Sequence, residues 1–395
     1  MTAPDASRAK TIFISAAEAS GDSHAAKLIV ALRKRIDGVR IVGVAGERMS
    51  EEGCEVIEDF TSDASMLTGP LFKLGHYYRK IRRLQRAIMD IKPDIHVPVD
   101  SPALNWHLAK AARRSGASVV YYIAPQVWAW APWRVKKLAR LSDKVACILP
   151  FEEEYLNARG VNATYVGHPI CEDAPAGGQM PDITDAWYDG SWRVALLPGS
   201  RPAEIRNHTG PLIEVSKAIW RKWHKARCSF AAVNQSVADE IQRQCDRRHA
   251  HNIDIVTGPM AALEVLSQSN FAIAGSGTVT LQAAWYGVPM VIFYRTGPVV
   301  RMLYRTAGRS RRLLATPHLS LVNILAQRRI VPELIPWNGD TRHLVHSVMD
   351  VMSDLGYLHQ VRAELKDIAH SLRTPLSASD NTARVIAEVL ADKGS

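Results

Sequence analysis

Short apolar runs alternate with helical patterns along most of the chain. The β-branched run Thr11–Ser15 comes first, and apolar residues then recur at helical spacing from Ala26 to Leu32. VRIVGVAG follows as a second apolar run, and DIHVPVD, SVVYYIAP and KVACILP each precede a polar turn and a helical pattern. Strands that are apolar throughout and alternate with helices are typical of a parallel sheet covered on both faces.

The alternation breaks once, where Pro, Gly and Asp dominate, and restarts with WRVALLPGS, ARCSFAAVN, NIDIVTG, NFAIAGSG and VPMVIFY. The break predicts a linker at residues 173–190. We therefore expect two Rossmann-like α/β domains, over residues 1–172 and 191–345, with helices over 346–395 closing the fold. A chain of 395 residues suits two cores, and no apolar run reaches the roughly 20 residues of a membrane-spanning helix.

The amino-acid composition gives the chain a net positive charge. The chain has 49 Lys and Arg against 39 Asp and Glu, a net charge of +10, which favours a polyanionic partner: nucleic acid, anionic lipid or a phosphorylated substrate. The five cysteines are scattered without a C-x-x-C pair or zinc spacing, so we expect reduced thiols and no metal. The first residues lack an apolar signal core, which predicts a cytoplasmic protein.

Candidate chemistry lies in the strand-to-helix turns, because open parallel sheets bind ligands at the carboxyl ends of their strands. Two such domains would hold a ligand in the cleft between them. In LLPGSRPAEI, Arg201 follows the turn made by Pro198 and Gly199. Its guanidinium matches the geometry of a phosphate, although an ordinary surface arginine is an open alternative.

A second turn, AGSGTVTLQ, carries Gly275 and Gly277 at the start of a short helix. Glycines let the backbone approach a ligand, and helix-start amides attract anions. Thr280 stands where a dinucleotide fingerprint needs glycine, and no G-K-[ST] follows as in a P-loop. We expect an anion site here, with simple capping by Ser276 or Thr278 as the alternative.

Two turns of the first half carry acidic groups. Asp100 ends the apolar run in PVDSPALNWHL, where a carboxylate can take a proton from a hydroxyl or simply cap the next helix. The turn EASGDSHAAKL supplies groups that can bind hydroxyls, namely Glu18, Ser20, Gly21 and Asp22.

Aromatic residues crowd the segment YYIAPQVWAWAPWRVKKL, in which Trp128, Trp130 and Trp133 precede Arg134. Tryptophans in a loop stack on sugar rings, lie against lipid, or pack between domains, and the sequence leaves these alternatives open.

A further segment, SMLTGPLFKLGHYYRKIRRLQRA, mixes apolar and basic residues, and residues 301–314 have the same character. Such segments suit an anionic membrane surface, or else a solvated helix face with extended arginines. Because no nucleic-acid motif is present, we favour lipid. The predicted membrane contacts are Met66, Leu67, Leu71, Phe72, Leu74, Arg79, Arg82 and Arg83.

Taken together, the motifs resemble the lipid-A-disaccharide synthase family, whose fold is GT-B. The matching segments are EASGD, GVAGERM, VDSPALN, YYIAPQVWAW, ILPFEEEYL, VGHP, LLPGSRPAEI, AGSGTVTLQAA, SLVNILA and VPELI. The resemblance implies inverting transfer of 2,3-diacylglucosamine from UDP to the 6-hydroxyl of 2,3-diacylglucosamine 1-phosphate. It also implies no metal or other cofactor, a homodimer, and a peripheral position on the inner face of a Gram-negative inner membrane.

The resemblance also implies a role for each matching residue. Asp100 is expected to be the general base, and Arg201 to stabilise the departing UDP together with the amides at 275–278. The implied acceptor-side residues are Glu18, Ser20, Gly21, Asp22, Asn105 and Arg134. The implied UDP-side residues are Gly199, Ser200, Arg201, Asn234, Gly275, Ser276, Gly277, Thr278, Gln282 and Asn323.

Five positions depart from the family pattern: Ala17, Ala103, Val322, Pro336 and Gln282. Gln282 replaces a glutamate that grips the ribose, and a glutamine makes such a bond without the charge. These departures keep two alternatives open. One is another UDP-sugar enzyme of the same fold, with a different acceptor or with 2-epimerase activity. The other is a non-catalytic relative that binds a nucleotide or a lipid.

Overall fold

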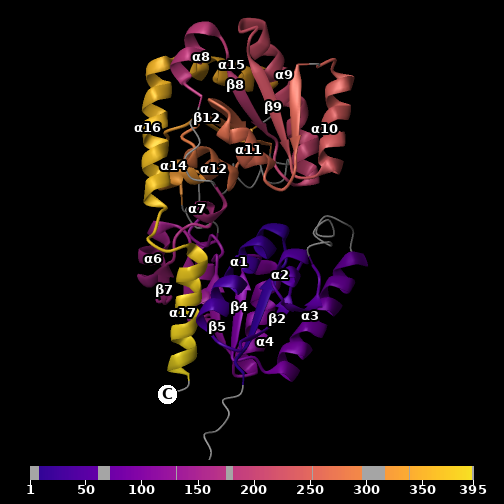
Figure 1. Ribbon diagram of the computed structural model, residues 1–395, viewed down its shortest axis with the longest axis vertical. Helices are drawn as coiled ribbons and strands as arrows, with labels where there is room; N and C mark the ends of the chain where they lie inside the picture. Colours follow the sequence, from indigo (N-terminus) through magenta and orange to yellow (C-terminus); the bar gives the residue numbers. More distant parts are fainter. Residues whose placement is uncertain are drawn as a thin grey trace, which may run out of the picture. The chain divides into compact units, whose positions relative to one another are not determined.

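The computed structural model describes residues 9–60, 72–129, 131–174, 181–250, 252–295, 316–337 and 339–393. These residues form two compact units (Figure 1). The first unit combines Met1–Glu172 with Arg373–Ser395, and the second is Asp173–Leu372. No helix of the described residues has both the length and the apolar character needed to cross a membrane.

The first unit contains a parallel sheet in the order β3-β2-β1-β4-β5-β6-β7. Its strands are β1 (Thr11–Ala16), β2 (Arg40–Val44), β3 (Glu55–Glu58), β4 (Ile95–Val99), β5 (Ser118–Tyr122), β6 (Lys144–Cys147) and β7 (Ala163–Tyr165). Its helices are α1 (Ala19–Arg35), α2 (Glu47–Glu51), α3 (Phe72–Ile91), α4 (Pro102–Arg114), the 3-10 turn η2 (Pro132–Arg134), α5 (Val135–Leu141), α6 (Pro150–Asn157), α7 (Ile170–Asp173) and α17 (Ala378–Asp392). The strand order reverses between β1 and β4, so the turns after these two strands flank the position where such sheets bind ligands.

The second unit contains a parallel sheet in the order β10-β9-β8-β11-β12-β13. Its strands are β8 (Arg193–Leu197), β9 (Arg227–Ala232), β10 (Ile253–Thr257), β11 (Phe271–Ala274), β12 (Met290–Arg295) and β13 (Glu333–Trp337). Its helices are α8 (Ile183–Asp189), α9 (Pro202–Lys222), α10 (Gln235–Arg247), α11 (Ala261–Ser267), α12 (Val279–Trp285), α14 (Leu321–Leu325), α15 (Thr341–Met352) and α16 (Leu355–Ser371). Here the order reverses between β8 and β11, at the two turns that carry Arg201 and Gly275.

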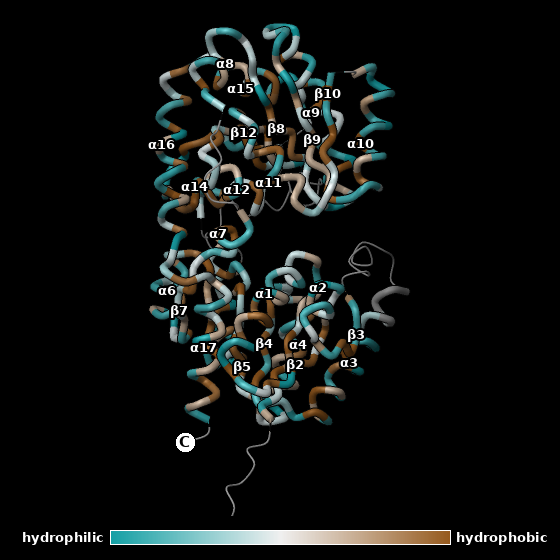
Figure 2. The backbone as a smooth tube through the Cα atoms, in the orientation of Figure 1, coloured by the Kyte–Doolittle hydropathy of each residue, from teal (hydrophilic) through white to brown (hydrophobic). Residues whose placement is uncertain are grey.

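Both faces of the first sheet are buried. Ile12 and Ile14 of β1 pack on one face with α1 and α17, while Phe13 between them packs on the other face with α3 and α4. Each fully buried side chain of this size contributes about 1.5–3 kcal/mol relative to exposure. Helix α10, which covers the sheet of the second unit, is itself buried on one side only. It buries Ala238, Ile241 and Cys245, while most of its other residues are hydrophilic (Figure 2).

The predicted linker and the predicted C-terminal block both differ from the structure. Residues 183–189 form α8, which Asp182 caps by accepting from the Thr184 amide, and Ile183 packs in the core of the second unit. Seven helical residues between Pro, Gly and Asp are too few to show a period. Helices α15 and α16 lie in the second unit, whereas α17 packs against α1 in the first.

Candidate functional site

Asp100 lies in a strained turn at the end of β4. Asp100 has φ 47° and the next residue, Ser101, has φ 45°. This left-handed conformation costs a non-glycine residue about 1–3 kcal/mol, so the surrounding fold must hold it. The Asp100 amide donates to the carbonyl oxygen of Tyr122 at 3.1 Å, which fixes the turn to β5.

The side chain of Asn105 holds this turn from within. Its amide nitrogen donates to the carbonyl oxygens of Val99 and Asp100 at 3.0 and 2.7 Å, and to that of Ser15 at 3.3 Å. The Tyr121 hydroxyl also donates to the Asp100 carbonyl, at 2.8 Å. Because Asn105 is 0% exposed, the prediction that it contacts a ligand is wrong, and its role is to position Asp100.

A buried histidine extends the network that Asn105 begins. The Ser15 hydroxyl donates to the Asn105 side-chain oxygen at 2.7 Å, so Nε2 of His96, 2.8 Å away, must donate to Ser15. Complete burial lowers the pKa of His96 to about 3, which keeps the ring neutral. The network therefore joins β1, β4 and α4 beneath the turn.

A hollow of about 250 Å³ in the first unit brings Asp100 and Arg134 together. Its lining is Asp100, Pro102, Pro125, Gln126, Val127 and Arg134. A carboxylate and a guanidinium at one hollow suit a ligand that carries both a hydroxyl and an anionic group. Two of the predicted residues of the first unit, Asp100 and Arg134, therefore line one hollow.

The tryptophans near this hollow have different roles. Trp128 is buried, and its indole nitrogen donates to Glu152 Oε1 at 2.7 Å, so it packs in the core. Burial raises the pKa of Glu152 to about 7, although the bonds from Trp128 and the Leu149 amide lower it. Trp133 is 55% exposed and free to meet a ligand, while Trp130 lies outside the described residues.

The turn after β1 carries one structural and several accessible groups. Asp22 is buried and accepts from the amides of Gly46 at 2.7 Å and Arg48 at 3.1 Å, so it caps α2. The prediction that Asp22 binds a hydroxyl is therefore wrong. Ser20 is exposed and Glu18 is half-buried at the start of α1, whereas Gly21 is buried within that helix.

In the second unit, the turn at Arg201 is held by Glu204. Glu204 Oε2 accepts from the amides of Ser200 and Arg201 at 3.1 and 3.2 Å, so these amides serve the helix cap rather than a ligand. Gly199 has φ 111°, and a Cβ there would collide with Glu204. The Arg201 side chain remains 68% exposed, with Nη1 3.6 Å from Glu204 Oε1.

His208 supports the same turn and was not predicted. Its Nδ1 donates to the Pro198 carbonyl at 2.7 Å, and its Nε2 accepts from the Arg295 amide at 3.2 Å. Burial lowers the pKa of His208, so the neutral ring bridges β8 and β12. Glu204 was also missed, although a glutamate three residues into a helix is a recognisable capping signal.

The turn at Gly275 presents backbone amides that lack an acceptor in the described part of the chain. Among the described residues, the backbone amides of Ser276, Gly277 and Thr278 donate to no protein acceptor. Gly277 has φ 132° in open space, and the Thr278 side chain does not cap α12. The predicted anion site fits this geometry better than the alternative of capping by Thr278.

Of the remaining nucleotide-side predictions, Asn323 is wrong. It is fully buried, where its oxygen accepts from the Ile330 and Val331 amides and its nitrogen donates to Glu333. Asn234 is exposed after β9, and its side chain caps α10. Gln282 is half-buried on α12, and it stays a predicted contact.

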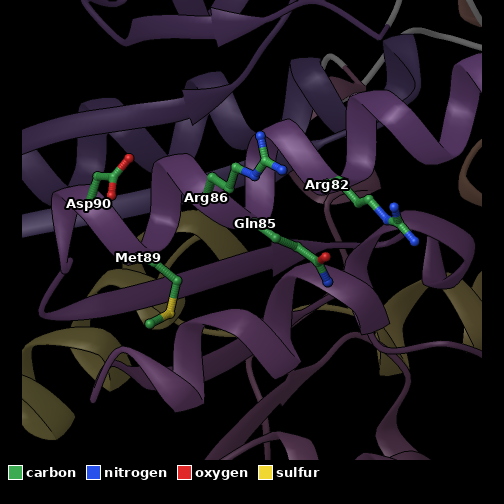
Figure 3. A pocket seen from close by; sticks show the side chains of 5 residues that line it. All are labelled: Arg82, Gln85, Arg86, Met89 and Asp90. Carbon is green, nitrogen blue, oxygen red and sulfur yellow. The ribbon is translucent and has the colours of Figure 1, made fainter.

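The predicted membrane segment is only partly described. Met66, Leu67 and Leu71, with residues 301–314, lie outside the described residues, as do the side chains of Phe72 and Leu74. Arg79, Arg82 and Arg83 are exposed on α3, opposite the buried Ile81, Leu84 and Ile88. A hollow of about 340 Å³ lies on the same helix and is lined by the five side chains labelled in Figure 3, namely Arg82, Gln85, Arg86, Met89 and Asp90. Because all five side chains come from one helix, this hollow is a surface groove rather than a formed site.

The five cysteines agree with the expectation of reduced thiols. All five cysteines are free thiols, and burial raises the pKa of Cys54 to about 12. In the part of the chain that the structure describes, no three His, Cys, Asp or Glu side chains are placed to hold a metal ion.

Known proteins resemble the chain over nearly its whole length. The family model described as lipid-A-disaccharide synthetase matches residues 12–386. The lipid-A-disaccharide synthase of Acidobacterium capsulatum is 32% identical over 94% of both chains. That of Myxococcus xanthus is 34% identical over 82% of this chain and 83% of its own.

A solved structure shows the same fold at low identity. The UDP-GlcNAc 2-epimerase of Neisseria meningitidis, solved with UDP-GlcNAc, is 14% identical, with a TM-score of 0.57 over 97% of this chain and 99% of its own. The predicted fold class, GT-B with two parallel-sheet α/β domains, is thereby confirmed. At this identity the likeness shows the fold alone.

Proposed function

The chain belongs to the lipid-A-disaccharide synthetase family, and from this premise we propose the roles of its residues in the reaction. It is a UDP-sugar-dependent glycosyltransferase that joins UDP-2,3-diacylglucosamine to 2,3-diacylglucosamine 1-phosphate. The products are the β-1,6-linked disaccharide 1-phosphate and UDP. The family assignment disfavours the alternative of a 2-epimerase.

Asp100 acts as the general base. Its carboxylate takes the proton of the acceptor 6-hydroxyl as the oxygen attacks C1 of the donor sugar. The bond from C1 to the UDP oxygen breaks as the new bond forms on the opposite face, and the electron pair leaves with UDP. The observation that carries this assignment is the strained turn that Asn105 holds from beneath, because it fixes one carboxylate at an open hollow.

The second unit stabilises the departing diphosphate. The three unused amides of Ser276, Gly277 and Thr278 donate to phosphate oxygens, and the exposed guanidinium of Arg201 adds a charge. A preorganised donor aimed at developing charge is worth about 3–4 kcal/mol of barrier. Gln282 contacts the ribose, and Glu18, Ser20 and Arg134 contact the acceptor.

The reaction is tested with both lipid substrates and mass detection of the disaccharide. Asp100→Asn should abolish product formation while binding of the UDP-sugar persists, because the base acts on the acceptor. Near-normal turnover by this variant would refute the assignment of the base. Ser23→Ala, which removes a half-buried hydroxyl from α1, serves as the control substitution.

The protein also acts as a peripheral protein at the inner face of the inner membrane. The exposed arginines of α3 lie near two partly exposed apolar side chains, Tyr78 at 49% and Met89 at 40%. Such a surface binds anionic lipid and releases it as salt rises. Purified protein should therefore sediment with anionic but not neutral vesicles. The family resemblance further predicts a homodimer, which sedimentation velocity would test.

A further inference from the structure

Two basic side chains, Arg134 and Lys137, flank the indole of Trp106, and Lys110 lies one helical turn beyond Trp106 on α4. Lys137 Nζ lies 4.0 Å from the ring centroid of Trp106, and Arg134 Cζ lies 5.8 Å from it. The charges of Lys110 and Arg134 both lower the pKa of Lys137, after the larger effect of its partial burial. Lys110, Arg134 and Lys137 are called the basic cluster below.

In the described part of the chain, the three side chains of the basic cluster form no ion pair. Among the described residues, no Asp or Glu oxygen lies within 4.0 Å of a nitrogen of these three side chains. Other basic residues of the same unit are paired, such as Arg113 with Asp143 at 2.6 Å. Mutual repulsion destabilises an unpaired cluster, and a bound anion removes that repulsion.

One member of the basic cluster, Arg134, lies beside the proposed base. Arg134 lines the hollow together with Asp100, and Trp106 follows Pro102 by four residues on α4, about 6 Å along the helix axis. A sugar that reaches Asp100 with one hydroxyl therefore extends toward the cluster with its remaining substituents.

We propose that Lys110, Arg134 and Lys137 form the subsite for the 1-phosphate of the acceptor sugar. This inference rests on the function proposed above and adds the group that Arg134 binds. A phosphate monoester carries a charge between −1 and −2 near neutral pH and three acceptor oxygens, which three cationic donors match. Holding the phosphate at the cluster orients the ring and presents its 6-hydroxyl to Asp100.

The test compares two acceptors in neutral detergent micelles, one with the 1-phosphate and one with a free 1-hydroxyl. Lys137→Met keeps the side-chain stem over Trp106 and removes the charge. It should raise the KM of the phosphorylated acceptor about tenfold and leave the KM of the other acceptor unchanged. Lys137→Arg should restore most of the wild-type difference in KM between the two acceptors. Lys136→Gln, the exposed neighbour on α5, is the matched control and should behave as the wild type.

Two results would overturn the subsite. An equal effect of Lys137→Met on both acceptors would mean that the cluster does not recognise the phosphate. If Lys137→Met instead lost binding to phosphatidylglycerol vesicles and kept the wild-type difference in KM between the two acceptors, the cluster would be assigned to a lipid headgroup. Failure of the wild type to make a disaccharide from either acceptor would instead refute the proposed function, so the two failures are distinct.

Discussion

Replacing Asn105 by alanine tests whether the turn at Asp100 is held from within the fold. The Asn105 amide donates to three carbonyl oxygens and accepts from the Ser15 hydroxyl, all in a fully buried environment. Alanine leaves these groups unsatisfied and opens a void, at a cost of roughly 2–4 kcal/mol in the free energy of unfolding. Release of the turn also lets Asp100 leave its left-handed conformation.

The catalytic consequence should exceed the loss of stability. A catalytic group displaced by about 1 Å loses about 100-fold in rate. We therefore expect kcat of Asn105→Ala to fall about 100-fold under conditions where the variant remains folded, with a small change in the KM of the UDP-sugar. Urea denaturation measures the first effect, and steady-state kinetics with mass detection of the disaccharide measures the second.

Asn381→Ala is the matched control for this experiment. Asn381 is also buried in the first unit, where it donates to the carbonyl oxygens of Val166 and Leu376 at 3.0 and 3.3 Å. Its loss should destabilise the fold to a similar degree and leave kcat nearly unchanged. If both variants lost kcat equally, the effect of Asn105 would be one of stability, and the reasoning about the turn would be refuted.

Three further predictions concern the second unit and the buried histidines. Arg201→Met should lower kcat about 100-fold, because the departing diphosphate loses the stabilising positive charge of the guanidinium. Acceptor affinity, measured by equilibrium binding, should change little. A change in acceptor affinity with kcat unaltered would contradict this. Gln282→Glu should tighten UDP binding severalfold in calorimetry if α12 faces the ribose, and unchanged binding would show that it does not. Burial lowers the pKa of His96 and His168 from 6.5 to about 3, so between these values the unfolded chain binds protons that the folded chain does not. Stability should therefore fall as the pH drops below 6.5, by about 1.4 kcal/mol per pH unit for each histidine, and His168→Gln should make the measured slope shallower.

The sequence located the turns well because their position follows from hydrophobic periodicity. Asp100 directly follows the apolar strand β4, and Arg201 lies in the turn that follows the apolar strand β8. Each of these strands lies at the point where the strand order of its sheet reverses. A parallel sheet places such turns at one edge whatever the details of packing. The fold class and the two turns were therefore predictable from local pattern alone.

The direction of a polar side chain was not predictable in the same way. Asn105, Asp22 and Asn323 belong to the expected motifs, yet each turns inward and satisfies buried backbone groups. Polar residues near a site divide between those that bind a ligand and those that hold the loop, and motif membership does not separate them. His208 was missed because its role depends on contacts made after folding, whereas Glu204 carried a local capping signal that the sequence analysis did not use.

Contacts between distant segments were also beyond the sequence pattern. Ala383 and Ile386 of α17 pack in one cluster with Ile12 and Ile14 of β1. The helical period of α17 shows that one face is apolar, but it does not show which sheet that face covers. The predicted division of the chain therefore failed at its C-terminal end.

The return of α17 to the first unit bears on the order in which a nascent chain folds. Residues 173–372 are continuous, so the second unit is complete once Leu372 has left the ribosome. The first unit must wait for Ala378–Asp392, although its sheet is made first. Until then the apolar surface that α17 covers stays exposed to water, and the part of the enzyme that carries Asp100 is completed last.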